Sequence, residues 1–244
     1  ALFFCQNKVI INRKTFSPIL TLASTNFILT NNAFLQNETL FIEIQPPNNL
    51  NESYQLKTIK DLIKITNTKL TAQLLQGIQF INFINKYQYC STCQNKLIHI
   101  NYSYEKKCQN CKATYFPNLA PAVIVLIQKQ QQILLAKHRD LKDFHALIAG
   151  FVDIGETAEE AVHRETLEET GLKIHQLQYF KSQSWPFPNS FMLAFTANYL
   201  SGEINVDHQE LLDAQWFDLE NLPKIPSLPS ISRELINYAI AKST

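Results

Sequence analysis

The chain of 244 residues has no long hydrophobic run and no large excess of charge of either sign. Its longest strongly apolar stretch, about residues 122–127, is far shorter than the roughly 20 residues that span a bilayer. No basic segment followed by an apolar one opens the chain, so we expect no signal peptide, no membrane contact and a cytoplasmic location. The formal net charge is +1 and charged residues make up 18%, which argues against a polyanion-binding surface over the whole protein.

Glycine and histidine are also sparse, with five and six residues. The histidines are scattered, without an H-x3-H pair or a pairing with cysteine, so we assign none of them a catalytic role. His163 is expected on a helix surface. Hydrophobic residues make up 45% of the chain, which is enough for a packed core.

Two of the five glycines frame the most informative pattern in the chain, G-x5-E-x7-R-E-x-x-E-E-x-G-L. A pattern with this many fixed polar and glycine positions is not expected by chance. Its fixed positions are Gly150, Glu156, Arg164, Glu165, Glu168, Glu169, Gly171 and Leu172.

Residues 157–170 are predicted to form a helix. Thr157 is a suitable N-cap, Glu160 completes a capping-box pattern, and Gly171 stands where a left-handed C-terminal residue is expected. The spacing i, i+3, i+4 puts Glu165, Glu168 and Glu169 on one face of this helix, where Arg164 can reach Glu168 one turn later.

Three carboxylates on one helix face repel each other unless a cation lies among them. Oxygen ligands without a thiolate suit Mg²⁺ or Mn²⁺. The alternative is an acidic helix face that is merely solvated. The framing glycines, the upstream Glu156 and the order of arginine and glutamate favour the metal site.

Four of the five cysteines form two pairs, Cys90-x2-Cys93 and Cys108-x2-Cys111. Two such pairs predict one tetrahedral Zn²⁺ per chain, and the site would be structural because the protein fills all four positions. Two disulfides are the alternative, which the lack of a secretion signal disfavours. Cys5 is expected to be an ordinary thiol.

Three domains are expected. Residues 1–87 are expected to form an α+β N-terminal domain. Their pattern predicts short strands at 9–11, 19–22, 26–29 and 39–44 and a helical periodicity over 56–87. Residues 88–117 carry the zinc ribbon, and Pro117 and Pro121 mark a linker. Residues 118–244 form the third domain.

In this third domain, strands are predicted at 122–128, 132–137, 145–149, 174–182, 191–199 and 214–218, and a last helix near 231–241. Mixed strands with helices on both faces fit an α/β/α sandwich.

The glycine-framed pattern resembles the Nudix box, the metal-binding signature of hydrolases that cleave a nucleoside diphosphate linked to another group. Residues 182–190 are similar to the S-Q-P-W-P-F-P-x-S motif of the NADH pyrophosphatase subfamily, with Ser184 in place of the usual proline. The ribbon, the box and this motif occur in the subfamily's order, and the resemblance covers about residues 86–220. It implies a Nudix α/β/α sandwich preceded by a zinc ribbon and an α+β domain.

The resemblance also implies an activity: hydrolysis of NADH and NAD⁺ to AMP and nicotinamide mononucleotide, and removal of NAD caps from RNA 5′ ends, by a homodimer. It implies that Glu165, Glu168, Glu169 and Glu210 bind Mg²⁺ or Mn²⁺ and that the first three are catalytic. Thr166 stands where the box usually has an aliphatic residue, which is expected to affect packing behind the helix.

The substrate-binding residues are likewise implied by the resemblance. Phe151 would stack on a base, and Tyr115 matches an aromatic residue that the family delivers across a homodimer interface. Each of these aromatic residues could instead belong to the core. Gln183, Trp185 and Ser190 would shape the nucleotide pocket.

Other functions stay open. A Nudix pyrophosphatase for ADP-ribose or dinucleoside polyphosphates would keep the fold, and the motif at 182–190 argues against it. The lysines of the ribbon, which are Lys96, Lys106, Lys107 and Lys112, could touch RNA phosphates or could simply aid solubility. A non-catalytic zinc-ribbon RNA-binding module is a third alternative, which the intact acidic positions disfavour.

Overall fold

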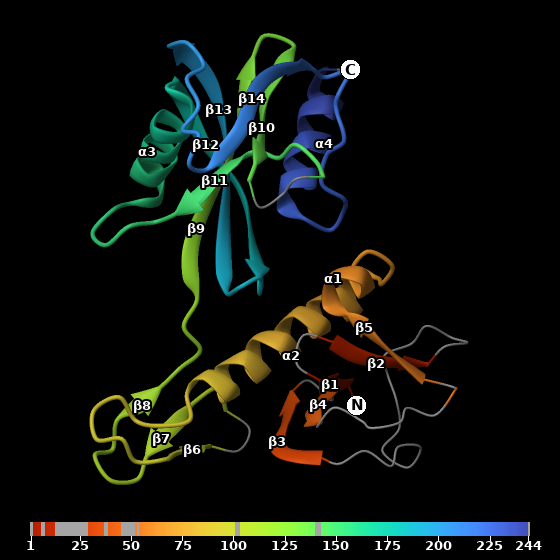
Figure 1. Ribbon diagram of the computed structural model, residues 1–244, viewed down its shortest axis with the longest axis vertical. Helices are drawn as coiled ribbons and strands as arrows, with labels where there is room; N and C mark the ends of the chain where they lie inside the picture. Colours follow the sequence, from red (N-terminus) through yellow and green to blue (C-terminus); the bar gives the residue numbers. More distant parts are fainter. Residues whose placement is uncertain are drawn as a thin grey trace. The chain divides into compact units, whose positions relative to one another are not determined.

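The structure, a computed structural model, describes residues 2–5, 8–12, 29–36, 39–44, 52, 54–100, 103–139 and 143–243. The chain divides into two compact units, Ala1–Asn118 and Leu119–Thr244 (Figure 1). The boundary between the units falls between Pro117 and Pro121. Among the described residues, no helix has the length and apolar character needed to cross a membrane.

The first unit contains a sheet in the order β3-β4-β1-β2-β5. In it, β1 pairs in parallel with β4, and the other neighbouring strands are antiparallel. The strands are β1 (Leu2–Cys5), β2 (Lys8–Asn12), β3 (Leu29–Gln36), β4 (Thr39–Ile44) and β5 (Tyr54–Thr58).

The strands predicted at 9–11 and 39–44 are confirmed as parts of β2 and β4. The strand predicted at 19–22 lies outside the described residues. So does the one predicted at 26–29, apart from Leu29, which begins β3.

The helix predicted over residues 56–87 is wrong at its beginning. Residues 54–58 form β5, which pairs with β2, and two helices follow: α1 (Ile59–Leu62) and α2 (Thr68–Lys86). The last residue of β5 caps α1, and the side chain of Asn67 caps α2 by accepting a hydrogen bond from Leu70 N–H. Pairing with a distant strand therefore overrides the local apolar periodicity.

The ribbon forms a small antiparallel sheet of β6 (Leu97–His99), β7 (Lys106–Cys108) and β8 (Thr114–Tyr115). It contacts α2, because Gln76 Nε2 donates a hydrogen bond to the Tyr104 hydroxyl at 2.6 Å. The ribbon is therefore attached to the helix that precedes it.

The second unit contains a mixed sheet in the order β12-β13-β9-β10-β14, and β11 also pairs with β9. Only β13 and β9 run parallel among these described pairs. The strands are β9 (Ala120–Lys129), β10 (Gln132–His138), β11 (Ile148–Phe151), β12 (Lys173–Trp185), β13 (Ser190–Ser201) and β14 (Leu211–Asp218).

The strands predicted for this unit are present, most of them longer than predicted by a few residues. The short strand predicted at 145–149 begins later, at Ile148, and ends at Phe151. Ala146 instead forms an isolated bridge to Ala136.

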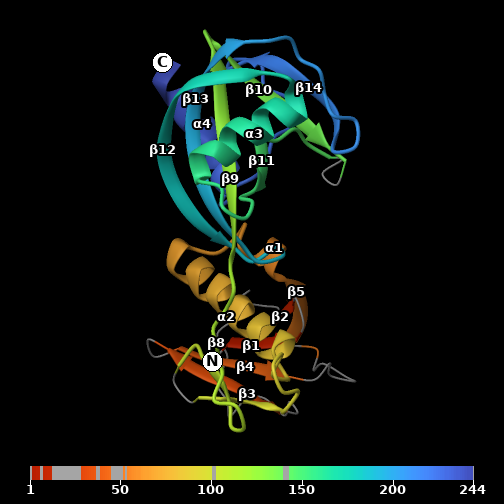
Figure 2. The same cartoon turned by 90° about the vertical axis from the view of Figure 1, so that its left-hand side faces the viewer.

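Helix α3 (Ala158–Thr170) and helix α4 (Ile231–Ser243) cover opposite faces of the sheet. In Figure 2, α3 lies in front of the sheet and α4 behind it. The predicted α/β/α sandwich is confirmed.

Strand β9 lies at the centre of this sandwich and is buried on both faces. Val123 and Val125 join the apolar cluster that contains Ala161 of α3. Ile124 and Leu126 join the cluster that contains Leu235 of α4. Alternate side chains of a strand point to opposite faces, so an unbroken apolar run at 122–127 is what such a strand requires.

Candidate functional site

Helix α3 begins and ends as the sequence predicts. Thr157 Oγ1 accepts a hydrogen bond from Glu160 N–H at 3.2 Å, and Thr157 N–H donates to the Glu160 carboxylate at 2.8 Å. Gly171 ends the helix with a φ of 73°, in the left-handed region, and its N–H donates to the Leu167 carbonyl at 2.8 Å. Both ends of the helix are therefore fixed by local contacts.

The acidic face of α3 borders an open pocket of about 390 Å³. Glu165, Glu168 and Glu169 line it from the helix, and Glu210 lines it from the turn before β14. The structure therefore brings together the four residues predicted to bind a catalytic metal. Its further lining residues are Asn205, Val206 and Asp207.

Gly150 on β11 leaves the space that the carboxylate of Glu165 occupies. A Cβ at position 150 would lie 2.0 Å from Glu165 Cδ and 2.1 and 2.3 Å from its two oxygens. Any other residue at this position must displace the carboxylate. The first glycine of the motif thus leaves room for a close approach between strand and side chain, which spacing alone does not reveal.

Arg164 holds the carboxylates of the motif in place. Its Nε and Nη2 donate to the two oxygens of Glu156 at 2.8 and 2.9 Å. Its Nη1 donates to Glu165 at 2.9 Å and to Glu168 at 3.0 Å, which confirms the predicted contact with Glu168. The hydrogen bonds from Arg164 lower the pKa of Glu156, so Glu156 stays ionised and orients the guanidinium.

Glu169 is the most deeply buried carboxylate of the pocket, with a relative exposure of 3%. Burial, followed by repulsion from Glu165 and Glu210, raises its pKa to about 8. Burial is also the main cause that raises the pKa of Glu165. Within the described residues, Glu169 Oε2 is buried without a hydrogen-bond partner. A buried oxygen without a donor, among other carboxylates, fits a divalent cation.

The turn before β14 is attached to the C-terminal end of α3 through Asp207. Its N–H donates to the Glu169 carbonyl at 3.0 Å, and its own carbonyl accepts from Glu210 N–H at 3.1 Å. Its carboxylate accepts from Gln209 N–H at 2.8 Å. Asp207 was not among the residues predicted from the sequence, where the available signal was an acidic residue three positions before Glu210.

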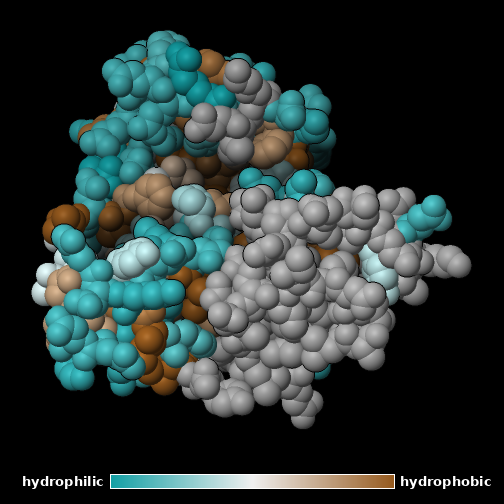
Figure 3. Space-filling view, turned by 60° about the horizontal axis from the view of Figure 1, so that its bottom comes forward, coloured by the Kyte–Doolittle hydropathy of each residue, from teal (hydrophilic) through white to brown (hydrophobic). Residues whose placement is uncertain are grey.

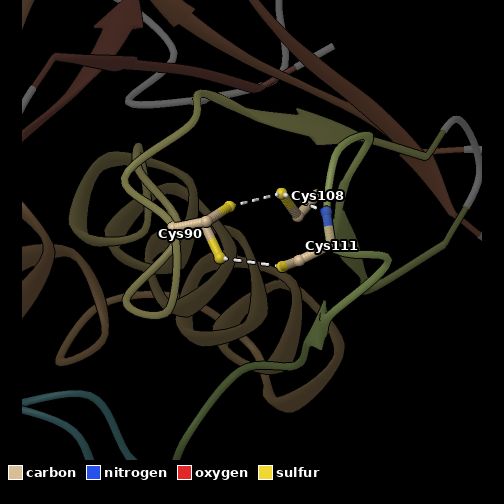
Figure 4. Close-up of side chains that lie close together, drawn as sticks. Cys90, Cys108 and Cys111 are labelled. Atoms are coloured by element: carbon tan, nitrogen blue, oxygen red, sulfur yellow. Dashed lines mark hydrogen bonds between the residues drawn. The ribbon is translucent and has the colours of Figure 1, made fainter.

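The two cysteine pairs form turns of the same construction. In the first, Gln94 N–H donates to the Cys90 carbonyl at 2.9 Å, and in the second, Lys112 N–H donates to the Cys108 carbonyl at 3.1 Å. Gln94 and Lys112 both have positive φ, at 60° and 64°. Figure 4 shows the two turns facing each other with their sulfurs inward.

The four sulfurs lie within 4.8 Å of one another, and among the described residues they form the one group of three or more His, Cys, Asp or Glu side chains placed closely enough to share a metal ion. The sulfurs of Cys90 and Cys111 are 3.5 Å apart (Figure 4). Those of Cys93 and Cys108 are 3.4 Å apart. A disulfide needs about 2.05 Å, so all four are free thiols and the alternative of two disulfides is wrong. Tetrahedral Zn–S bonds of about 2.3 Å would separate the sulfurs by about 3.8 Å, which is close to these values.

Tyr115 lies on β8 beside the first cysteine turn. Its hydroxyl is 3.2 Å from Cys90 Sγ, and its ring centroid is 5.9 Å from that of Tyr87. The hydrogen bond from this hydroxyl is the main cause that lowers the pKa of Cys90 to about 7. The next residue, Phe116, is 61% exposed. The predicted contact of Tyr115 with a substrate base stays a prediction.

The motif at residues 182–190 forms the hairpin between β12 and β13, in which Trp185 pairs with Ser190. Gln183 Nε2 donates to the Pro229 carbonyl at 2.7 Å, and its Oε1 accepts from Ile231 N–H at 2.8 Å. Gln183 therefore caps α4. None of the three predicted residues of this motif lines the acidic pocket, and their role in nucleotide binding stays a prediction.

Three other residues in or beside the motif differ in their exposure. Phe151 follows Gly150 on β11 and is 50% exposed. His163 is exposed on α3, as predicted. Thr166 is fully buried behind the acidic face, and its Oγ1 has no hydrogen-bond partner in the described part of the chain.

The lysines of the ribbon differ in their surroundings. Lys106 is buried, and its Nζ donates to the carbonyls of Ile84 and Tyr87 at the end of α2. The hypothesis of a phosphate contact is therefore wrong for Lys106. Lys107 pairs with Glu105 at 3.2 Å. On the face that Figure 3 shows, hydrophilic surface is interrupted by apolar patches.

Comparison with known proteins assigns most of the second unit to one family. Residues 118–238 match the family model of the NUDIX domain. The NAD-capped RNA hydrolase NudC of Shigella dysenteriae serotype 1 is 41% identical over 167 residues, which are 68% of this chain and 65% of that protein. The protein of the same name from Escherichia coli O1:K1 gives the same values. The match thus spans slightly less than two thirds of the length of these relatives.

Among solved structures, a NUDIX hydrolase from Nitrosomonas europaea superposes with a TM-score of 0.55. It is 22% identical, and the superposition covers 64% of this chain and 92% of that one. This likeness concerns the fold alone, and it agrees with the α/β/α sandwich of the second unit.

Proposed function

We propose that this chain, which belongs to the NUDIX family, hydrolyses the pyrophosphate bond of NADH and NAD⁺ to AMP and nicotinamide mononucleotide. The same chemistry would remove an NAD cap from the 5′ end of RNA, the substrate stated in the name of the NudC relatives. The motif at residues 182–190 favours NADH over ADP-ribose or a dinucleoside polyphosphate as substrate.

The observation that carries this proposal is the convergence of four glutamates on one pocket: Glu165, Glu168, Glu169 and Glu210. A non-catalytic binding module has no need of such a pocket. Keeping the Glu169 carboxylate buried beside other acidic groups, with Oε2 unpartnered, costs free energy unless a cation is bound.

The four glutamates would hold Mg²⁺ or Mn²⁺, since all their donor atoms are oxygens. When bound, such a cation neutralises the pyrophosphate and lowers the pKa of a bound water. With a cation bound, Glu169 would be an ionised ligand, because the positive charge would offset the burial and the repulsion from other carboxylates that raise its pKa. Arg164 keeps Glu165 and Glu168 oriented, and its pairing with Glu156 balances its own charge.

We infer that Cys90, Cys93, Cys108 and Cys111 hold one structural Zn²⁺. Their sulfur spacing supports this. Free thiols also support a reducing compartment such as the cytoplasm.

We further infer a homodimer whose chains each have three domains, at residues 1–87, 88–117 and 118–244. Phe151 would stack on a base of the substrate, which its 50% exposure beside Gly150 permits. Tyr115 would approach the substrate across the dimer interface. Gln183, Trp185 and Ser190 would shape the nucleotide pocket through the hairpin and the start of α4.

The test is turnover of NADH by the purified chain with Mg²⁺ or Mn²⁺, with products identified by mass spectrometry. Glu169→Gln removes a ligand charge with almost no change in shape, and it should lower kcat by at least about 100-fold. His163→Gln, on the exposed side of the same helix, is the matched control and should behave as wild type. Unchanged turnover in Glu169→Gln would refute the proposed metal site.

A further inference from the structure

The hydroxyl of Tyr115 lies inside the first cysteine turn and contacts three polar groups. It is 3.2 Å from Cys90 Sγ, 2.9 Å from Ser91 N and 3.0 Å from Ser91 Oγ. Tyr115 lies 25 positions after Cys90 in the sequence, so the fold of the ribbon creates these contacts.

The chemistry of the three groups fixes which of them donates. Ser91 N–H can only donate, and it points at Tyr115 Oη. A cysteine that ligates a metal is a thiolate and can only accept, so the single proton of the Tyr115 hydroxyl goes to Cys90 Sγ. Ser91 Oγ–H then donates to the second lone pair of Tyr115 Oη. A hydroxyl has one donor and two acceptor sites, and all three are used here.

The ring that carries this hydroxyl is fixed from the other side. It packs against Tyr87, the residue that follows α2. The buried Lys106, also on the ribbon, donates to the carbonyl of Tyr87 and so ties that residue to β7. The hydroxyl is therefore held at the cysteine turn by contacts that do not involve the metal, which reduces the entropy lost in using it.

We propose that Tyr115 is a positioning residue of the zinc site, whose hydroxyl supports the Cys90 thiolate and the backbone turn that carries it. This inference rests on the proposed structural Zn²⁺, and it assigns the hydroxyl of Tyr115 a task separate from stacking on a substrate. Partners of metal ligands orient the ligand atoms, and their loss typically weakens metal binding by about 10- to 100-fold.

Tyr115→Phe separates the two tasks, because stacking needs the ring whereas support of the thiolate needs the hydroxyl. The full chain is loaded with Zn²⁺, and transfer of the metal to a chromogenic chelator is followed in time. We expect Tyr115→Phe to release zinc at least about 10-fold faster than wild type. Tyr89→Phe is the matched control, since Tyr89 adjoins the same cysteine but is 64% exposed, and it should release zinc as wild type does.

A second readout reports the hydrogen bond itself. In the Co²⁺-substituted chain, loss of a donor to the thiolate should move the sulfur-to-metal charge-transfer band to lower energy in Tyr115→Phe and leave it unchanged in Tyr89→Phe. If Tyr115→Phe does not fold, Ser91→Ala, which removes one partner of the hydroxyl, should give a smaller change in the same direction.

The outcomes distinguish this inference from the proposal on which it rests. A wild-type chain that binds neither Zn²⁺ nor Co²⁺ would overturn the zinc site and the role of Tyr115 together. A wild-type chain that binds one Zn²⁺, with identical release and identical Co²⁺ spectra in both tyrosine variants, would overturn the role of Tyr115 alone.

Discussion

Replacing Gly150 with alanine should displace the carboxylate of Glu165 while leaving strand β11 in place. The φ of Gly150 lies outside the left-handed region, so alanine can adopt the same backbone conformation. The pairing of Gly150 with Val123 on β9 can also persist, because alanine keeps the backbone donor and acceptor. The substitution should therefore affect the Glu165 side chain that faces β11, and not the pairing of the strand itself.

The size of the effect follows from the distances. The new Cβ would lie 2.0 Å from Glu165 Cδ, whereas ordinary contact begins at 3.4 Å, so the carboxylate must move by about 1.4 Å. Misplacement of a positioned group by about 1 Å can lower the rate by about 100-fold. We therefore expect kcat/KM for NADH to fall by about 100-fold. The free energy of unfolding should change little, because the atoms that must move are the far end of a flexible side chain beside an open pocket.

A double-mutant cycle with Glu165→Ala tests the cause of the loss. In the Glu165→Ala background the clash is absent, so adding Gly150→Ala should change neither kcat/KM nor the free energy of unfolding by much. Steady-state kinetics and urea denaturation would supply the values. Full activity in Gly150→Ala, or the same loss in both backgrounds, would refute the steric explanation.

Three further predictions concern the same domain. In the metal-free protein the pKa of Glu169 is about 8 in the folded state and near 4.5 in the unfolded state, so the folded state binds this proton more tightly. Proton binding by Glu169 therefore stabilises the fold below pH 4.5, and this stabilisation is lost as the pH rises to about 8. Thermal melts should show a larger loss in wild type than in Glu169→Gln, in which the raised pKa of Glu165 remains. Thr166→Val should raise the free energy of unfolding by about 1 kcal/mol, as measured by urea denaturation, because a methyl group of the same shape replaces a buried hydroxyl without a partner among the described residues. A free energy of unfolding lower than that of wild type would indicate an unrecognised partner of the hydroxyl. Phe151→Ala should raise KM for NADH by about 10-fold with little change in kcat if the exposed ring stacks on a base, and an unchanged KM would exclude stacking.

Helix α3 was predictable because its signals are local. Thr157, Glu160 and Gly171 lie within one turn of the ends that they fix, and their contacts form as expected. The cysteine turns were predictable for the same reason, since each pair closes its own loop. Local sequence therefore carried most of the information about the two candidate metal sites.

Features that depend on distant partners were not predictable in this way. Residues 56–58 begin the predicted helical periodicity, yet they belong to strand β5 because β2 is available to pair with them. Lys106 looks like a solvated charge until α2 supplies two carbonyls for it. Asp207 gains its place at the pocket from its hydrogen bond with the end of α3. In each case the second partner lies in another element of the fold.

The most direct test of the proposed hydrolysis of NAD(H) is a competition among substrates. The purified chain, with Mg²⁺ or Mn²⁺, is given equimolar NADH, NAD⁺, ADP-ribose and diadenosine tetraphosphate, and the products are identified by mass spectrometry. We predict that NADH is consumed fastest and yields AMP and reduced nicotinamide mononucleotide. Faster consumption of ADP-ribose or diadenosine tetraphosphate would contradict the proposed substrate, and no consumption of any of them would contradict the proposed activity.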